Sequence, residues 1–350
     1  MAKGDRNVGW PGFFRVFTVL CAIMLLLARQ GQQLTTAGSG AWQALSVYEG
    51  LTLWTVPALF MLWGMSALEE GKPQVSSSLT GLVLPAFGLL VFWGVVYAIV
   101  PPLLAGQGGN FTLAGLADLL LSAVRGDTYF HLWVLYPLIG LYLVHPVLHR
   151  FTVSASQGEV RYLLGLCFLF AALLPLWSAF RPDSVLAGLL DRLQVHLVLG
   201  WVGCYVGGWY LRHYTIGRIP EYVLYILGVL GLVLTLMGHR LTGGSREPWQ
   251  RLMAPNLLLT AAAFCTLFRY VLGVSEERSR RRAVSQIGDC ALGVYLIHQL
   301  WALIFQRLGL SLLAFSPALS VPLFALAFFL LSLPFAWLIS LIPGAGPRLT

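Results

Sequence analysis

The chain has 350 residues, of which 58% are hydrophobic and only 10% are charged. A soluble protein of this size carries roughly 25% charged residues, so the composition excludes a soluble globule and indicates a polytopic membrane protein. The formal net charge of +8 would favour nucleic-acid binding in a soluble chain. In a membrane protein, basic residues collect on cytoplasmic loops instead, and we expect no nucleic-acid partner.

Ten stretches are apolar over about 20 residues, the length that crosses a bilayer. They cover residues 11–29, 48–67, 79–104, 130–148, 161–180, 193–211, 221–238, 254–273, 286–305 and 317–342. Polar segments rich in glycine and serine separate several of them and favour turns. The sequence therefore predicts an all-α polytopic membrane protein with about ten transmembrane helices.

The positions of the basic residues indicate the orientation of these spans. Ten spans place both ends of the chain on one side, and more of the 22 Lys and Arg residues fall on that side, including an arginine run within 278–282. Cytoplasmic loops are enriched in such residues, which predicts an N-in and C-in topology. We expect one transmembrane domain over residues 1–350, with residues 1–10 and 343–350 as short cytoplasmic tails.

The five cysteines show no CxxC motif and no Cys/His cluster. All of them fall in apolar stretches, where cysteine behaves as a small hydrophobic residue, so we expect no metal site.

Arg15 lies a few residues into the first span, near its predicted cytoplasmic end. Two interpretations stay open for this residue. The guanidinium either reaches back to the interface, as long basic side chains do at span ends, or clamps the phosphate or carboxylate of a ligand.

Of the histidines that lie in or at the mouth of apolar spans, His131 and His298 are the candidate functional residues. His131 opens the fourth span at its outer end, where it is either hydrogen-bonded to backbone or acts as a general base. His298 lies about twelve residues into the ninth span, roughly 18 Å deep at 1.5 Å per residue, and shares a helix face with Tyr295. A histidine at that depth must face protein or a wet cavity, which favours a functional role.

Two further polar groups lie on predicted outer segments. One contains Asp191, Arg192 and His196, and the other spans residues 239–251. Either group would suit an anionic or sugar-rich ligand, but a solvated loop is the simpler interpretation of both.

Four segments resemble the acyltransferase type 3 family of integral membrane O-acyltransferases. Val56–Gly64 reads VPALFMLWG and is similar to the family's VPLFFMISG, and Leu84–Tyr97 is similar to its LP…FW…Y segment. His131–Pro146, with Leu148 and Arg150, matches HLWFLYALIGLYLLTPLL. Leu292–His298 reads LGVYLIH and matches FGIYLIH. The order and spacing of the segments extend the resemblance over nearly the whole chain.

The resemblance implies an acyl relay across a bacterial inner membrane. The family takes an acyl group, here expected to be acetyl, from cytoplasmic acyl-CoA and delivers it to a hydroxyl of an envelope glycan or lipid-linked acceptor. The donor is a substrate, and no bound cofactor is implied. On this basis His131, His298 and Tyr295 are the expected catalytic residues, and Arg15 and Lys72 are the expected donor-binding residues.

The sequence departs from the family pattern in two places. Arg15 matches the arginine of the first-span motif, but the histidine expected eleven residues later is Leu26. The family's basic pair after the second span is reduced to Lys72. A leucine cannot act as a base, so the alternative is a catalytically degenerate member that serves as a transporter or an accessory binding subunit in envelope glycan assembly. An ion or proton carrier ranks last, because the spans hold few acidic residues.

Overall fold

The computed structural model describes residues 10–69, 75–104, 129–193, 199–272 and 287–342, with scattered residues between 106 and 125. Every element in this part of the chain is helical. The contacts divide the chain into two compact units, each assembled from three separate stretches. Unit 1 comprises Met1–Leu25, Ser46–Lys72 and Val147–Ser285, and unit 2 comprises Leu26–Leu45, Pro73–Pro146 and Gln286–Thr350.

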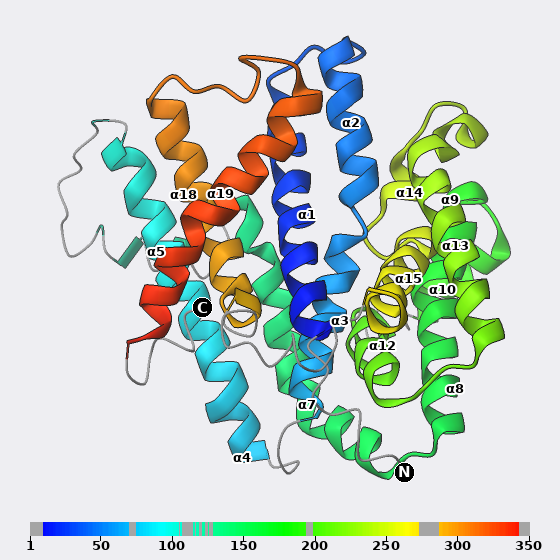
Figure 1. Cartoon of the computed structure of the whole chain (residues 1–350). Coiled ribbons are helices and arrows are strands. Elements are labelled where there is room, and N and C mark those ends of the chain that lie inside the picture. The colour runs from blue at the N-terminus through cyan, green and yellow to red at the C-terminus, as the bar shows by residue number, and fades with distance from the viewer. Residues whose placement is uncertain are drawn as a thin grey trace. The chain divides into compact units, whose positions relative to one another are not determined.

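Three helices contribute residues to both units. They are α1 (Trp10–Gln33), α2 (Gly40–Thr52) and α7 (Leu135–Ser154). The other elements of unit 1 are α3 (Thr55–Ala67), α8 (Gln157–Phe168), η3 (Leu169–Leu173), α9 (Leu174–Phe180), α10 (Val185–Leu193), α12 (Val202–His213), α13 (Arg218–Met237), η4 (Gly238–Thr242), α14 (Glu247–Gln250) and α15 (Pro255–Tyr270). The helix pair α13 and α15 packs side by side in unit 1 (Figure 1).

Glycines bring the backbones of α3 and α12 into direct contact. A Cβ on Gly64 would lie 1.8 Å from the backbone oxygen of Tyr205, and a Cβ on Gly208 would lie 2.0 Å from that of Met61. Only glycine fits at either position, as is common where membrane helices cross closely. Gly208 lies in the sixth predicted span, directly after Gly207.

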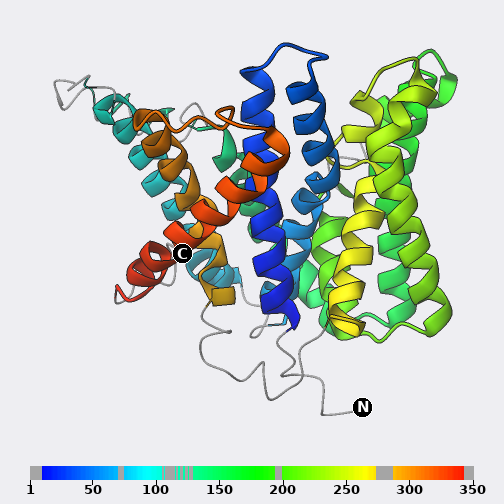
Figure 2. The ribbon, with the colours of Figure 1, turned by 45° about the horizontal axis from the view of Figure 1, so that its top comes forward.

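Unit 2 holds the remaining helices. They are α4 (Val75–Ser78), η1 (Leu79–Val83), α5 (Leu84–Leu104), η2 (Phe130–Val134), α18 (Ala291–Arg307) and α19 (Pro317–Ser340). The helix α18 packs against both α19 and α5, and α19 is seen crossing it (Figure 2). Prolines inside α5, α7 and α19 are tolerated because neighbouring groups in a membrane protein can satisfy the freed carbonyls.

Eight helical stretches of the described chain are long and apolar enough to cross a membrane. They are Trp10–Gln33, Gly40–Ala67, Val75–Leu104, Phe130–Ser154, Gln157–Phe180, Arg218–Thr242, Glu247–Tyr270 and Pro317–Ser340. Each coincides with a predicted span, so the all-α polytopic fold is confirmed. The two remaining predicted spans contain α12 and α18, which are 12 and 17 residues long. The count of ten and the N-in, C-in orientation stay predictions.

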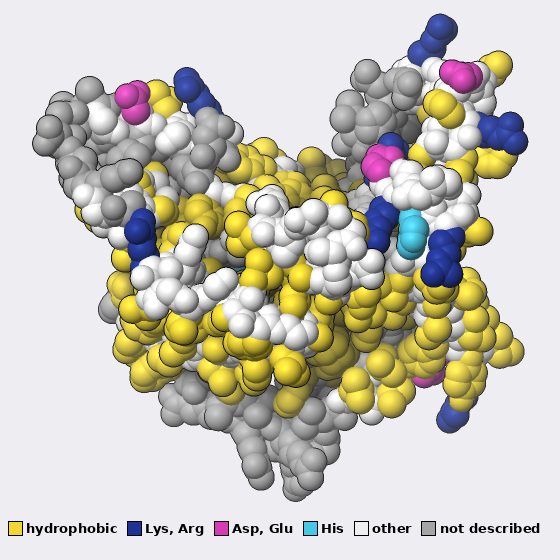
Figure 3. All heavy atoms as spheres, turned by 90° about the horizontal axis from the view of Figure 1, so that it is seen from above, with side chains coloured by type: hydrophobic (Ala, Val, Ile, Leu, Met, Phe, Trp, Pro, Cys, Tyr) yellow, Lys and Arg dark blue, Asp and Glu magenta, His cyan; other side chains and the backbone are white. Residues whose placement is uncertain are grey.

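The outer surface is apolar where a soluble protein would be charged. Helix α13 exposes Ile219, Ile226 and Val229 to between 61% and 78%, and hydrophobic side chains cover much of the surface in Figure 3. In a bilayer these side chains face lipid tails, and the polar backbone is satisfied inside each helix. The protein is therefore an integral membrane protein.

Candidate active site

A buried aromatic cluster in unit 2 contains all three predicted catalytic residues. We call it the histidine cluster; its members are Tyr97, Tyr129, His131, Tyr295 and His298. The rings of His131 and His298 have centroids 5.4 Å apart, and both side chains are fully buried. Tyr295 lies 5.8 Å from His131 and 5.7 Å from His298 by the same measure. Residues far apart in the sequence thus converge on one point.

The backbone of α18 sets the tautomer of His131. Its Nε2 lies 3.3 Å from the carbonyl oxygen of Leu296, and a carbonyl can only accept a hydrogen bond. Nε2 therefore carries the proton, and the lone pair resides on Nδ1. That Nδ1 is buried and has no hydrogen-bond partner among the described residues. His131 thus presents one basic nitrogen that the fold leaves unused.

A backbone carbonyl also sets the tautomer of His298. Its Nδ1 lies 2.5 Å from the carbonyl oxygen of Tyr295, one helical turn earlier in α18. Nδ1 therefore donates, and Nε2 keeps the lone pair. Within the described part of the chain, no group hydrogen-bonds to this Nε2, which is also buried. Both histidines are held by backbone carbonyls, and each offers one unpaired base nitrogen.

The tyrosines of the histidine cluster position its backbone. The Tyr97 hydroxyl donates to the Leu296 carbonyl oxygen at 2.5 Å, and the Tyr295 hydroxyl donates to the carbonyl oxygen of His131 at 3.0 Å. These two bonds join α5 and η2 to the same turn of α18. Tyr295 therefore holds His131 in place through the main chain, and its hydroxyl bonds to neither imidazole.

A cavity of about 340 Å³ lies next to the histidine cluster in unit 2. Tyr129 belongs to both: it lines the cavity, stacks on Tyr97 at 4.6 Å and meets His131 edge-on at 5.5 Å. Burial raises the pKa of Tyr129 above its ordinary value of 10.0, so the phenol stays neutral at physiological pH. The rest of the wall is formed by the C-terminal part of α1, by α18 and α19, and by the loop between these last two.

The described wall of this cavity is mostly apolar and contains several polar side chains, none of them charged. Its polar side chains include Gln30, Gln33, Gln306 and Ser311. The Nε2 of Gln30 donates to Oε1 of Gln299 at 3.0 Å. Such a wall suits a neutral ligand rich in hydroxyl groups, because amides can both donate and accept hydrogen bonds.

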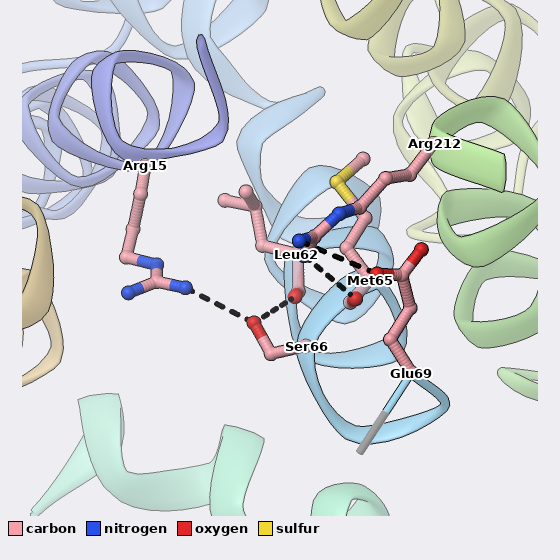
Figure 4. Close-up of polar contacts among 6 residues, drawn as sticks. All are labelled: Arg15, Leu62, Met65, Ser66, Glu69 and Arg212. Carbon is pink, nitrogen blue, oxygen red and sulfur yellow. Dashed lines mark hydrogen bonds and ion pairs between the residues drawn. The ribbon is translucent and has the colours of Figure 1, made fainter. Parts of the chain in front are cut away.

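A second polar group, in unit 1, surrounds the C-terminal end of α3. We call it the basic cluster; it consists of Arg15, Ser66, Glu69 and Arg212 (Figure 4). Arg15 Nη2 donates to Ser66 Oγ at 3.0 Å. Arg212 Nη1 donates to the Met65 carbonyl oxygen at 3.0 Å, and Arg212 Nη2 lies 3.4 Å from Glu69 Oε2. Two guanidinium groups at one helix end suit an anionic ligand, since the fork geometry matches phosphate oxygens.

The structure thus brings together the three predicted catalytic residues and places Arg15 in a separate cluster. Lys72, His196 and the arginine run at 278–282 lie outside the described residues, as does the side chain of Asp191. Leu26 is buried in α1, with 6% of its surface exposed. In the loop 239–251, Arg251 Nε bonds to Glu247 Oε1 at 2.5 Å, and both side chains are largely exposed, as a solvated loop requires.

Sequence reasoning missed several residues of these sites. They are Gln30, Tyr97, Tyr129, Arg212 and Gln299. Gln299 follows His298 directly and lies deep in an apolar span, a position that marks a polar residue as functional or paired. Arg212 ends a span at the predicted cytoplasmic side, where snorkelling is the usual reading. Only the fold shows that it meets the end of α3.

The chain also matches a known family over most of its length. A family model for an acyltransferase domain covers residues 8–341. No curated protein and no solved structure matches the chain. The family match supports a membrane-embedded transferase that takes an acyl group from a donor and passes it to an acceptor. Together with the four resembling segments, it shows that the chain belongs to the acyltransferase type 3 family.

Proposed function

We propose that this protein is a membrane O-acyltransferase that moves an acetyl group from acetyl-CoA to a hydroxyl of an envelope glycan. The observation that carries the proposal is the pair of buried imidazoles beside a cavity with uncharged polar side chains; each imidazole has one nitrogen without a hydrogen-bond partner among the described residues. General bases of this kind need a free lone pair near neutral pH, and histidine is the side chain that most often supplies it.

The donor belongs to the cytoplasmic side in this proposal. Arg15 and Lys72 hold the phosphates of acetyl-CoA, and Arg212 takes part of the role of the missing basic pair. The support is the position of both arginines at the end of α3, where their side chains lie at one helix end. The bacterial inner membrane is the matching location, because acetyl-CoA is cytoplasmic and the acceptor belongs to the envelope.

The acceptor hydroxyl reacts at the histidine cluster. His131 takes the hydroxyl proton on Nδ1 while the hydroxyl oxygen attacks the thioester carbonyl carbon. Tyr295 keeps His131 in position, and His298 supplies the second basic nitrogen along the path of the acyl group. Loss of a general base lowers the rate of acyl transfer by about 10²–10⁴-fold. His131 or His298 can replace the base that is missing at Leu26 only if its free ring nitrogen reaches the reacting hydroxyl.

The test is acetyl transfer by the purified protein in lipid vesicles, with labelled acetyl-CoA inside and glycan outside. We expect label on the glycan with the native protein and almost none with His131→Ala or His298→Ala. His239→Ala is the matched control, because His239 lies in η4 of unit 1, outside both clusters, and should transfer at the native rate. Absence of transfer by the native protein, or transfer that survives in both cluster variants, refutes the mechanism.

The second candidate is a degenerate member that binds or transports a glycan without catalysis. Its specific support is Leu26, which stands where the family has its first-span histidine. Leu26→His separates the two candidates. A catalytic chain should gain turnover from an additional base, whereas a binder should show no acetyl transfer before or after the change.

A further inference from the structure

The side chain of Gln299 is the feature that the proposed roles leave unexplained. It is fully buried in α18, directly after His298. Its Nε2 has no hydrogen-bond partner within the described part of the chain. A buried amide nitrogen without a partner is unfavourable and is uncommon in native structures. Such a donor is expected to have a partner that arrives with a ligand.

A neighbouring glutamine fixes the direction of that donor. Gln30 Nε2 donates to Gln299 Oε1 at 3.0 Å. This bond occupies the oxygen of the Gln299 amide and leaves its N–H groups for a different partner. Because Gln30 also lines the cavity, the orientation of Gln299 is set from the side on which a ligand would bind.

The helical spacing places Gln299 one turn before the part of α18 that lines the cavity. Ala302, Leu303 and Gln306 all line the cavity, and they follow Gln299 by three, four and seven residues. Residues at these spacings share one face of an α-helix. Gln299 therefore lies one turn before the cavity-lining residues on the same face of α18, and it follows His298 directly in the sequence.

We propose that Gln299 is a catalytic residue that donates a hydrogen bond from Nε2 to the carbonyl oxygen of the acyl group during transfer. Gln30 is then a positioning residue that keeps the amide turned toward that oxygen. This inference rests on the proposed acyl transfer and adds the group that stabilises its negative charge. It requires no metal and no bound cofactor.

The acceptor oxygen forms a bond to the carbonyl carbon, its proton passes to the histidine nitrogen, and the π electron pair moves onto the carbonyl oxygen. The N–H of Gln299 stabilises that oxyanion. When the C=O bond re-forms, the C–S bond of the thioester breaks and the leaving thiolate takes the proton from the histidine. A donor placed at a developing oxyanion contributes about 10²–10³-fold to kcat.

The experiment compares Gln299→Met, Gln299→Asn and Gln30→Met with the native protein, using acetyl-CoA and glycan in vesicles. Methionine keeps the length of the side chain without a donor, and asparagine withdraws the amide by one methylene group. We expect kcat to fall about 10²–10³-fold in Gln299→Met, with KM for both substrates nearly unchanged. Smaller losses of kcat are expected in the other two variants.

The control is Gln43→Leu, an exposed glutamine of α2 whose Nε2 bonds to the Gly38 carbonyl, and it should match the native protein. A native kcat in either folded Gln299 variant overturns the oxyanion role while the histidine mechanism stands. A parallel rise in KM with an unchanged kcat also overturns it, since that pattern indicates substrate binding alone. Absence of transfer by the native protein overturns both proposals together.

Discussion

The basic cluster of unit 1 and the histidine cluster of unit 2 treat their polar groups in opposite ways. In the basic cluster, Arg212 and Glu69 each keep 29% of the side chain exposed and lie in contact with each other. In the histidine cluster, His131 and His298 are fully buried, and each has a ring nitrogen with no hydrogen-bond partner in the described part of the chain. The basic cluster is thus partly exposed and internally paired, whereas the histidine cluster is buried.

This difference in exposure suits the basic cluster to ligand binding and the histidine cluster to proton transfer. Ionic groups with access to water can exchange one partner for another at little cost in free energy, which suits the binding and release of an anionic donor. Proton transfer instead needs a defined tautomer and no competing water. The carbonyl oxygens of Leu296 and Tyr295 supply the first condition, and the complete burial of both rings supplies the second.

The largest expected effect concerns the two histidines together. His131→Gln and His298→Gln should each reduce single-turnover acetyl transfer by about 10²–10⁴-fold. The double variant should be little worse than the slower single variant, because residues that act as a unit are strongly non-additive. Single-turnover rates with labelled acetyl-CoA measure this. If the fold-reduction in the double variant equals the product of the two single reductions, the two rings act independently. That result would contradict the proposal that they act as one cluster.

The next effect concerns the helix contact that places the basic cluster. Gly208 precedes Arg212 by four residues on α12, and Gly64 precedes Ser66 by two on α3. In Gly208→Ala the new Cβ would lie 2.0 Å from the Met61 backbone oxygen, and overpacking of this kind destabilises by about 1–3 kcal/mol. We expect a lower Tm in detergent and a raised KM for the donor. Gly207→Ala is the control, because its Cβ would meet only Leu164 at 3.6 Å; equal Tm values in the two variants would contradict this account.

A smaller effect is expected from the guanidinium groups themselves. Arg15→Gln should raise the KM for acetyl-CoA about tenfold, which corresponds to about 1.4 kcal/mol, while kcat stays near the native value. Arg15→Lys should also raise the KM for acetyl-CoA, but by less than Arg15→Gln, since an ammonium group keeps the charge and lacks the fork geometry. Titration of KM against salt completes the test. A KM that does not respond to salt in the native protein would place the donor's phosphates elsewhere.

The smallest effect is expected from Tyr129→Phe. Burial raises the pKa of Tyr129 above 10.0, so its hydroxyl stays protonated and carries no charge below that pH. Removing the hydroxyl keeps the ring that stacks on Tyr97. Between pH 6 and 9, the transfer rates of the variant should therefore stay within about twofold of the native rates. A pH profile of kcat checks this. A profile that differs in shape from the native one would make Tyr129 part of the proton path.

Local patterns predicted the fold class and singled out three members of the histidine cluster. Apolar stretches of about 20 residues located eight helices that the structure also shows. The break at Leu53–Trp54 separates α2 from α3; it lies between Gly50 and Pro57, and Pro57 stands in the first turn of α3. The depth of His298 and its shared face with Tyr295 marked the histidine cluster, because a polar side chain in an apolar span needs a partner or a role.

The remaining contacts depend on packing between distant segments. Tyr97 and Leu296 are 199 residues apart, and Gln30 and Gln299 are 269 residues apart. No periodicity or motif encodes such pairs, since they arise only when α1, α5 and α18 come together. The same holds for Arg212 and Met65 at the end of α3. The tautomers of His131 and His298 follow from backbone carbonyls whose positions no sequence pattern specifies.

The place of Tyr129 has a consequence for side reactions. The neighbouring cavity of about 340 Å³ has room for about ten water molecules at roughly 30 Å³ each. Water is itself a hydroxyl nucleophile, and a base that it can reach will hydrolyse a thioester as readily as it activates an acceptor. The ring of Tyr129 contacts His131 and also lines the cavity, so this ring is shared by the cavity wall and the surroundings of the base. In an acyltransferase, the access that water has to the base decides whether a donor acylates its acceptor or is hydrolysed.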